Sequence, residues 1–210
     1  MGEALIRTVQ AGYDALAPRF GEWMARVEGD PWERFVEELE RLSPRGSGGR
    51  LLDLGCGGGV KTKRLARGFE VVGVDISEEQ LRLARAEVPE ATFVQADFAE
   101  LDFYEASFDV VVAFYSIVHV PRAQHSALFA DIRRWLKPGG LFLASLSRVG
   151  GPDRTEEWLG VEMFFSGFPA ETNRQLVREA GFELLFDEVV WMREPGVDVA
   201  FLWVLGEKPS

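Results

Sequence analysis

The sequence contains a single cysteine, Cys56, so it forms no internal disulfide bond. Chains without disulfides are typical of reducing compartments, and we therefore expect a cytoplasmic protein. No apolar run is long enough to span a bilayer, and residues 1–7 lack the charged-then-apolar layout of a signal peptide. These absences predict a chain without a membrane segment or an export signal.

Basic residues are also scarce. Lysine and arginine together number 23, against 34 aspartates and glutamates, which gives a formal net charge of −11. Duplex nucleic acids and anionic membranes are both bound by neutralising phosphate charge. We therefore expect neither as a partner. The sequence leads us to assign no metal site and no oligomeric state.

The most informative pattern lies at residues 51–59, where LLDL is followed at once by GCGGG. Leucines around one acid indicate a short buried strand, and VKTKRLA at 60–66 begins a helix. Strand, glycine turn and helix form the first unit of nucleotide-binding α/β domains. Glycine permits positive φ and lets a ligand lie against bare backbone. The alternative is a tight turn without a ligand. It is disfavoured because so many glycines destabilise a fold, and a ligand lying against their backbone would explain why they are there.

The spacing of these glycines decides between two cofactor classes. The dinucleotide fingerprint G-x-G-x-x-G would need a third glycine at Val60. The pattern D-x-G-x-G-x-G fits instead, and it resembles motif I of the class I methyltransferases, which bind S-adenosylmethionine. The resemblance implies that Asp53, Gly55, Cys56 and Gly57 belong to the cofactor site, with the backbone at the cysteine meeting the ligand.

Two further acids follow the next two strands. Residues 69–74 are a valine-rich strand that ends at Asp75, where a carboxylate of this fold accepts hydrogen bonds from ribose hydroxyls. Ile76 is assigned to the same site. Residues 91–95 form a third strand that leads into Asp97 and Phe98. This pair resembles the family's turn in which an aspartate meets the exocyclic amine of adenine. Asp75 alone does not separate methyltransferases from nicotinamide enzymes.

The fourth strand, residues 108–114, is mostly apolar and is expected beside the first, where ligands bind in doubly wound sheets. Phe114 at its end is therefore predicted to border the methyl end of the cofactor. His119 follows just beyond. An imidazole titrates near working pH, so His119 is the candidate general base if the acceptor is a hydroxyl. The other interpretation is a packed ring that shapes the pocket. His125 lies inside the next helix and is given little weight.

Residues 1–44 are expected to form a helical N-terminal cap, with Asp30 as the N-cap of its second helix. The cap either covers a sheet edge or closes over the ligand. Residues 13–20, YDALAPRF, are similar to the "Y-D-x-x-A" opening of many small-molecule methyltransferases. That similarity implies that Tyr13 lines the methionine end of the cofactor. Residues 43–49 read as a linker without periodicity.

The resemblance is strongest over residues 45–147 and includes an L-K-P-G-G turn before the fifth strand. Within one domain, 1–210, we expect a cofactor-binding core at 50–147 and an irregular, aromatic acceptor-side insertion at 148–168. The last helix and a terminal hairpin occupy 169–210. The predicted fold is α/β, a doubly wound seven-stranded, mostly parallel sheet with helices on both faces. Its strand order is 3-2-1-4-5-7-6, with strand 7 antiparallel.

The function implied is methyl transfer from S-adenosylmethionine to a small-molecule acceptor that is partly apolar or aromatic, with S-adenosylhomocysteine as product. Whether oxygen, nitrogen or carbon is methylated is left open. The alternatives are an NAD(P)-dependent oxidoreductase and a non-catalytic protein that binds S-adenosylmethionine. The missing glycine at Val60 and the terminal hairpin count against the oxidoreductase. A methylase of RNA or protein ranks low, because the sequence has no basic stripe and no Asn/Asp-Pro-Pro-aromatic motif.

Overall fold

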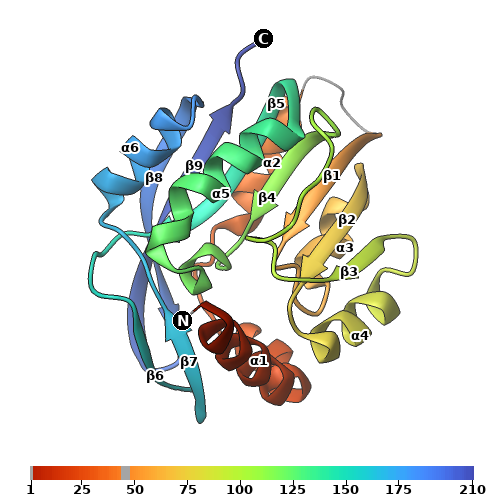
Figure 1. Ribbon diagram of the computed structural model, residues 1–210. Helices are drawn as coiled ribbons and strands as arrows, with labels where there is room; N and C mark the ends of the chain where they lie inside the picture. Colours follow the sequence, from red (N-terminus) through yellow and green to blue (C-terminus); the bar gives the residue numbers. More distant parts are fainter. Residues whose placement is uncertain (1, 44–47) are drawn as a thin grey trace.

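The computed structural model describes residues 2–43 and 48–210, which form one large sheet between two layers of helices (Figure 1). Residues 44–47, most of the linker predicted at 43–49, lie outside the described residues. Within the described part, no helix combines the length and apolar character needed to cross a membrane.

The large sheet has seven strands in the order β3-β2-β1-β4-β5-β9-β8, and β9 runs antiparallel to both of its neighbours. The strands are β1 (Gly49–Leu54), β2 (Phe69–Asp75), β3 (Thr92–Gln95), β4 (Phe108–Ala113), β5 (Leu136–Ser147), β8 (Glu183–Glu194) and β9 (Val197–Glu207). Since β8 and β9 are the sixth and seventh strands of this sheet, the predicted order is confirmed. The chain reverses its direction across the sheet between β1 and β4, which is where such sheets bind ligands.

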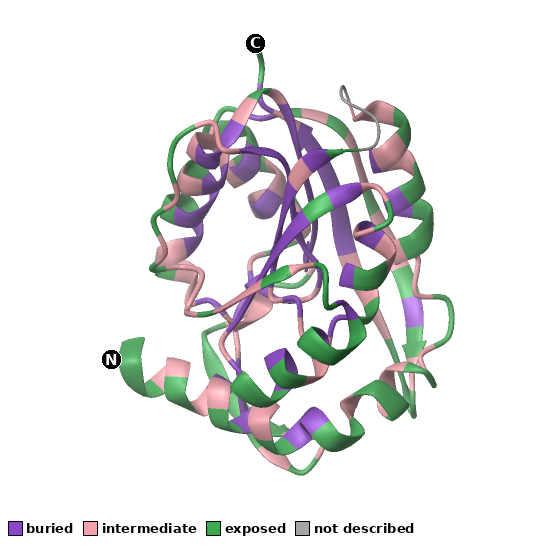
Figure 2. Cartoon of the chain, turned by 90° about the vertical axis from the view of Figure 1, so that its right-hand side faces the viewer, coloured by how far each residue is buried: buried purple, intermediate pink, exposed green. Residues whose placement is uncertain are grey.

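Helices cover both faces because alternate residues of the central strands point in opposite directions. Leu52 and Leu54 pack in the core under α5 and α6, whereas Leu51 packs under α2 and α3. Figure 2 shows the central strands buried and the outward sides of the helices exposed. The helical elements are α1 (Gly2–Met24), α2 (Trp32–Leu42), α3 (Val60–Leu65), α4 (Glu78–Glu87), the 3₁₀ turn η1 (Ile117–His119), α5 (Arg122–Trp135) and α6 (Ala170–Glu179).

Two local predictions need correction. The second helix begins at Trp32, with Pro31 in the N-cap position, so Asp30 lies one residue outside it. Its carboxylate still accepts a hydrogen bond from the Trp32 N–H at 3.2 Å, which braces the entry to the helix. The fifth strand begins at Leu136 rather than after the Lys-Pro-Gly-Gly segment. A shift of register opposite Phe108 and Val110 accommodates this irregular start.

The expected irregular insertion contains a second, two-stranded sheet. Strands β6 (Arg154–Trp158) and β7 (Val161–Phe165) form an antiparallel hairpin that lies against α1 (Figure 1). Met163 and Phe164 of the hairpin are fully buried against Val9 and Leu16 of the helix. A Cβ at Gly12 would lie 2.6 Å from the Cε of Met163, so helix and strand approach as closely as glycine allows. The N-terminal helix and the insertion therefore share a small core of their own.

Candidate functional site

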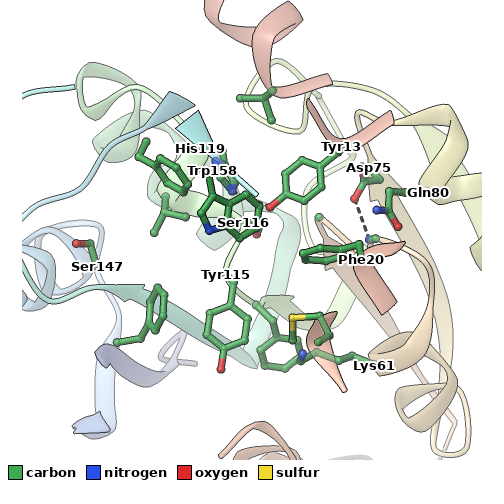
Figure 3. A pocket seen from close by; sticks show the side chains of 18 of the residues that line it. Tyr13, Phe20, Lys61, Asp75, Gln80, Tyr115, Ser116, His119, Ser147 and Trp158 are labelled. Carbon is green, nitrogen blue, oxygen red and sulfur yellow. Dashed lines mark hydrogen bonds between the residues drawn. The ribbon is translucent and has the colours of Figure 1, made fainter. Parts of the chain in front are cut away.

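The carboxyl ends of the parallel strands open into a cavity of about 1150 Å³. The structure brings every predicted site residue to its wall (Figure 3). They are Tyr13, Asp53, Gly55, Cys56, Gly57, Asp75, Ile76, Asp97, Phe98, Phe114 and His119. Residues from α1, β1, β2, the turn η1 and the segments that follow β3 and β4 thus meet at one place.

The glycine turn after β1 has the geometry that its sequence predicts. Gly55 has a φ of 78°, and a Cβ there would lie 2.3 Å from the Cβ of Ser116. Gly57 also has a positive φ, 54°, but the nearest atom to a Cβ there would be 3.9 Å away. Gly55 is therefore required by the protein's own packing, whereas Gly57 leaves bare backbone facing free space.

Asp75 lines the cavity and also accepts hydrogen bonds from the backbone of the glycine turn and of the residues that follow β2. Its Oδ2 accepts a hydrogen bond from the Gly57 N–H at 2.8 Å, and its Oδ1 accepts one from the Ser77 N–H at 2.9 Å (Figure 3). Each carboxylate oxygen has a second lone pair that remains for a ligand. Burial raises the pKa of Asp75, while these backbone donors oppose the rise.

Asp53 lies beneath the turn and is 2% exposed. Its Oδ2 accepts a hydrogen bond from the Thr62 hydroxyl at 2.8 Å, which ties β1 to α3. Burial raises the pKa of Asp53 to about 7, against the hydrogen bond from Thr62, which lowers it. The structure therefore gives this acid a bracing contact that the motif alone does not reveal.

Beyond β3, Asp97 is half-buried and accepts a hydrogen bond from the Ala99 N–H at 2.9 Å. Burial raises the pKa of its carboxyl group. Gln80 of α4 lies beside Asp75 at the cavity wall (Figure 3). Its Nε2 is buried and has no hydrogen-bond partner among the described residues. Because an unpaired buried donor is costly, this amide is available to a ligand.

Tyr13 and His119 form a direct pair. The Tyr13 hydroxyl lies 2.9 Å from His119 Nε2, and His119 Nδ1 lies 2.7 Å from the carbonyl oxygen of Phe164 in β7. A carbonyl only accepts, so the network assigns the ring proton to Nδ1 and makes the tyrosine hydroxyl the donor to Nε2. Burial lowers the pKa of His119 to about 4, so the ring is neutral at pH 7. It also raises the pKa of Tyr13.

A cluster that the sequence did not predict lies at another part of the wall. The Lys61 ammonium lies 3.5 Å from Asp30 Oδ2 and faces the rings of Trp32 and Tyr115 at 5.4 and 5.2 Å. The Tyr115 hydroxyl donates to Asp30 Oδ1 at 2.5 Å. Burial lowers the pKa of Lys61, whereas Asp30 raises it. Lys61 follows the glycine turn closely in the sequence, and this position could have pointed to it. No sequence pattern indicated that Asp30 would be its partner.

Tyr115 adopts a φ of 60°, in a region that side chains other than glycine rarely occupy. Its N–H donates to the Ser145 hydroxyl at 2.7 Å, and its own hydroxyl is held by Asp30. Backbone strain of this kind persists where surrounding contacts over-determine it, and it gathers at functional sites. The strained residue follows Phe114 directly, at the end of β4.

The other reactive side chains have quieter roles. Burial raises the pKa of the Cys56 thiol well above its ordinary value, so it is held as a thiol rather than a nucleophilic thiolate. His125 lies outside the cavity lining, and its Nε2 contacts the Val120 carbonyl at 2.8 Å. Within residues 2–43 and 48–210, no group of three or more His, Cys, Asp or Glu side chains is placed to hold a metal ion.

The aromatic insertion divides into core and cavity. Met163 and Phe164 are buried against α1, whereas Trp158 and Phe165 line the cavity. Part of the insertion is therefore core and part is cavity wall, and its acceptor-side role stays a prediction.

Comparisons with known proteins agree with this geometry. The sequence model of a methyltransferase domain family matches residues 51–140. An uncharacterized methyltransferase of Synechocystis sp. is 39% identical over 150 residues, covering 69% of this chain and 68% of that protein. The 24-methylenesterol C-methyltransferase 2 of Oryza sativa is 33% identical over 73% of this chain. This chain spans 46% of the rice protein's length.

A solved structure shares the fold. The S-adenosylmethionine-dependent methyltransferase structure from Methanosarcina mazei superimposes with a TM-score of 0.68, at 21% sequence identity. The match covers 78% of this chain and 93% of that one.

Proposed function

The chain belongs to the class I S-adenosylmethionine-dependent methyltransferases, and from that premise we propose that it methylates a small molecule held between α1, the β6–β7 hairpin and the ends of β4 and β8. The observation that carries the proposal is that the predicted cofactor motifs and the walls added by α1 and the hairpin line one cavity. The nicotinamide alternative receives no support from the relatives.

The residues present fit S-adenosylmethionine. The open space over Gly57 suits a ligand lying on bare backbone, and the unpaired amide of Gln80 suits a ligand acceptor. When bound, the cofactor supplies a methyl group already activated on a sulfonium. We propose that Asp75 accepts from the ribose hydroxyls and Asp97 from the adenine amine, with Ile76 and Phe98 against the purine.

Lys61 is our candidate for the carboxylate of the cofactor's amino-acid portion. It is a buried cation beside the glycine turn, and its distance of 3.5 Å from Asp30 is long for a charge-assisted hydrogen bond. A second carboxylate would complete its coordination. In this proposal Asp53 acts from below, by fixing the turn through Thr62.

Tyr13, Phe114 and His119 would surround the reacting end. Positioning and exclusion of water supply most of what methyl transfer needs, and such positioning can contribute up to ~7–11 kcal/mol. The base role expected for His119 stays a prediction. A pKa of about 4 makes it a weak base, and its Nε2 already accepts from Tyr13. We assign it first to holding the tyrosine hydroxyl in place.

The acceptor is proposed to be partly apolar or aromatic because Phe20, Trp23, Trp158 and Phe165 line the cavity. The names of the relatives do not identify the acceptor. The rice protein is named for a sterol, and a relative from Amycolatopsis mediterranei is named for a rifamycin. The cytoplasmic location inferred from the single cysteine also stays a prediction.

The function is tested by calorimetry and by isotope transfer. S-adenosylhomocysteine should bind with one-to-one stoichiometry, and NADH should not bind. Incubation with S-adenosylmethionine labelled in the methyl group and a broad acceptor panel should give a labelled product. Tight cofactor binding without any labelled product would favour the non-catalytic alternative, and preference for NADH would overturn the proposal.

A further inference from the structure

One wall of the cavity is a continuous surface of aromatic rings. Trp158 of the hairpin packs edge-on against Phe20 and Trp23 of α1, with ring centroids 6.0 and 5.4 Å apart. Phe165 extends the surface at 5.8 Å from Trp158. All four rings line the cavity and are only partly buried (Figure 3 labels Phe20 and Trp158). Such a surface binds flat apolar groups and also cations, through the negative faces of its rings.

An acid without a partner faces the same cavity. Glu194, the last residue of β8, lines the cavity and is half-buried, and its side chain has no hydrogen bond or ion pair with any described residue. Its charge adds to the burial that raises the pKa of Tyr13 and Tyr115, which line the same cavity. Burial raises the pKa of Glu194 itself, and no contact among the described residues opposes that rise.

Other charges of the cavity wall are already matched. Arg154 makes two contacts of 3.0 Å with Glu156. Asp198 pairs with Arg193 at 3.7 Å.

The remaining cations of the wall are engaged elsewhere. Lys61 pairs with Asp30, and Arg148 lies over the ring of Trp191 at 4.5 Å. Glu22 also lines the cavity, but it is exposed to water. Among the carboxylates of the cavity wall, Glu194 is therefore the one that is partly buried and has no hydrogen bond or cation from the described residues to stabilise its charge.

The backbone that carries Glu194 is fixed in place. Its neighbour Arg193 exchanges two backbone hydrogen bonds of 2.9 Å with Glu28, in the segment that follows α1. The end of β8 is thus tied to the N-terminal segment that contributes the aromatic wall. The fixed backbone keeps Glu194 at the cavity, so binding has only its side chain to order.

We propose that the acceptor carries a protonated amine, which Glu194 binds as a charge partner while the aromatic wall holds the apolar remainder of the molecule. The inference rests on the proposed function and specifies its substrate class. An anionic acceptor would be repelled by Glu194, and a neutral one would leave the carboxylate desolvated and unpaired. An ammonium supplies the opposite charge for the carboxylate, and its apolar remainder suits the aromatic wall.

The test uses the full chain saturated with S-adenosylhomocysteine. Arylalkyl amines such as phenethylamine and tryptamine are offered at pH 7.5, each beside the alcohol and the carboxylate with the same carbon skeleton. Binding is measured by calorimetry and native mass spectrometry. We expect the amines to bind at least ten-fold more tightly than their matched alcohols and acids. Glu194→Gln should weaken amine binding at least ten-fold and change alcohol binding less than two-fold.

The matched control is Glu183→Gln, which removes the same charge from the opposite end of β8, outside the cavity. It should bind amines as the unaltered protein does. If alcohols or acids bind best, if no amine binds, or if Glu194→Gln leaves amine affinity unchanged, the inference is overturned. Binding of S-adenosylhomocysteine is measured separately in each variant. If the unaltered protein does not bind S-adenosylhomocysteine, the proposed function is overturned instead.

Discussion

The Tyr13 hydroxyl lies 2.9 Å from His119 Nε2, although the two residues are 106 positions apart in the chain. The other ring nitrogen of the histidine reaches the Phe164 carbonyl in β7. One imidazole therefore joins the N-terminal helix, the turn after β4 and the hairpin. Because Nε2 of the buried ring accepts a hydrogen bond from Tyr13, the imidazole can join these three elements only in its neutral form.

The stability of the protein should therefore fall on acidification through His119. Its pKa is lowered from 6.5 to about 4 in the folded state, so between these values the unfolded chain binds a proton that the folded chain does not. The stabilisation is complete above pH 6.5 and is lost as pH falls to about 4, by up to roughly 3 kcal/mol at 1.36 kcal/mol per unit. Urea titrations of the protein and of His119→Gln across this range measure it. A constant difference between the two would contradict the assigned neutral ring.

Asp53 should act with the opposite sign in nearly the same window. Its pKa is raised from 3.8 to about 7, so its stabilising protonation is complete below pH 3.8 and is lost as pH rises to 7. Asp53→Asn resembles the protonated acid and can still accept from Thr62. Its stability relative to the unaltered protein should rise between pH 4 and 7, by at most roughly 4 kcal/mol. Equal urea midpoints for the two proteins at pH 5 and pH 8 would count against a buried, hard-to-ionise Asp53.

Removal of the Asp75 side chain should weaken cofactor binding. Asp75→Ala loses the proposed ribose contacts, each worth roughly 1.5–3 kcal/mol as a charge-assisted hydrogen bond. Calorimetry with S-adenosylhomocysteine should show a loss of affinity of at least ten-fold. The N–H groups of Gly57 and Ser77 also lose an acceptor, so circular dichroism and thermal melting serve as controls for the fold. Unchanged affinity in a folded variant would remove Asp75 from the site.

Lys61→Met should distinguish two ligands that differ only in the amino-acid portion. Affinity for S-adenosylhomocysteine should fall at least ten-fold, because a contact of roughly 1.5–3 kcal/mol to a carboxylate is lost. Affinity for 5′-methylthioadenosine, which has no carboxylate, should stay the same. Lys63→Met is the matched control, since Lys63 lies on the same helix, is exposed and pairs with Glu87. Equal losses for both ligands would indicate a disturbed turn rather than a lost charge.

The two glycines of the turn should respond differently to alanine. Gly55→Ala adds left-handed backbone strain to an overlap with Ser116 and should cost more than roughly 2 kcal/mol of folding stability. Gly57→Ala meets open space, so only the strain of about 1–2 kcal/mol applies. Urea denaturation of both variants measures the difference. A Gly57 variant less stable than the Gly55 variant would be inconsistent with the described turn.

Much of the fold was predictable because the core strands carry their own signals. Val71, Val72 and Val74 form a valine run buried on both faces, and the glycine turn marks the end of β1. The hairpin was missed for the opposite reason. Residues 154–157 of β6 are all exposed and mostly charged, so they show no alternation that a strand prediction could use.

The candidate site divides in the same way. The predicted cofactor residues lie in short motifs after successive strands, so the sequence alone could place them at one edge of the sheet. Lys61 and Glu194 were not recognised, because a charged residue in a sequence does not reveal whether it is paired or buried. Tyr13 and His119 were each singled out, but their contact depends on how α1 docks, which no local pattern encodes.

Because α1 and the hairpin share a core, a chimera with a relative should exchange the two segments together. The close approach of Gly12 to Met163 couples their sequences, so transplanting either segment alone from a relative should lower the melting temperature. Transplanting both together would keep their packing and leave the glycine turn and the acids after β2 and β3 untouched. Chimeras of that kind offer a route to altered acceptor choice within one scaffold.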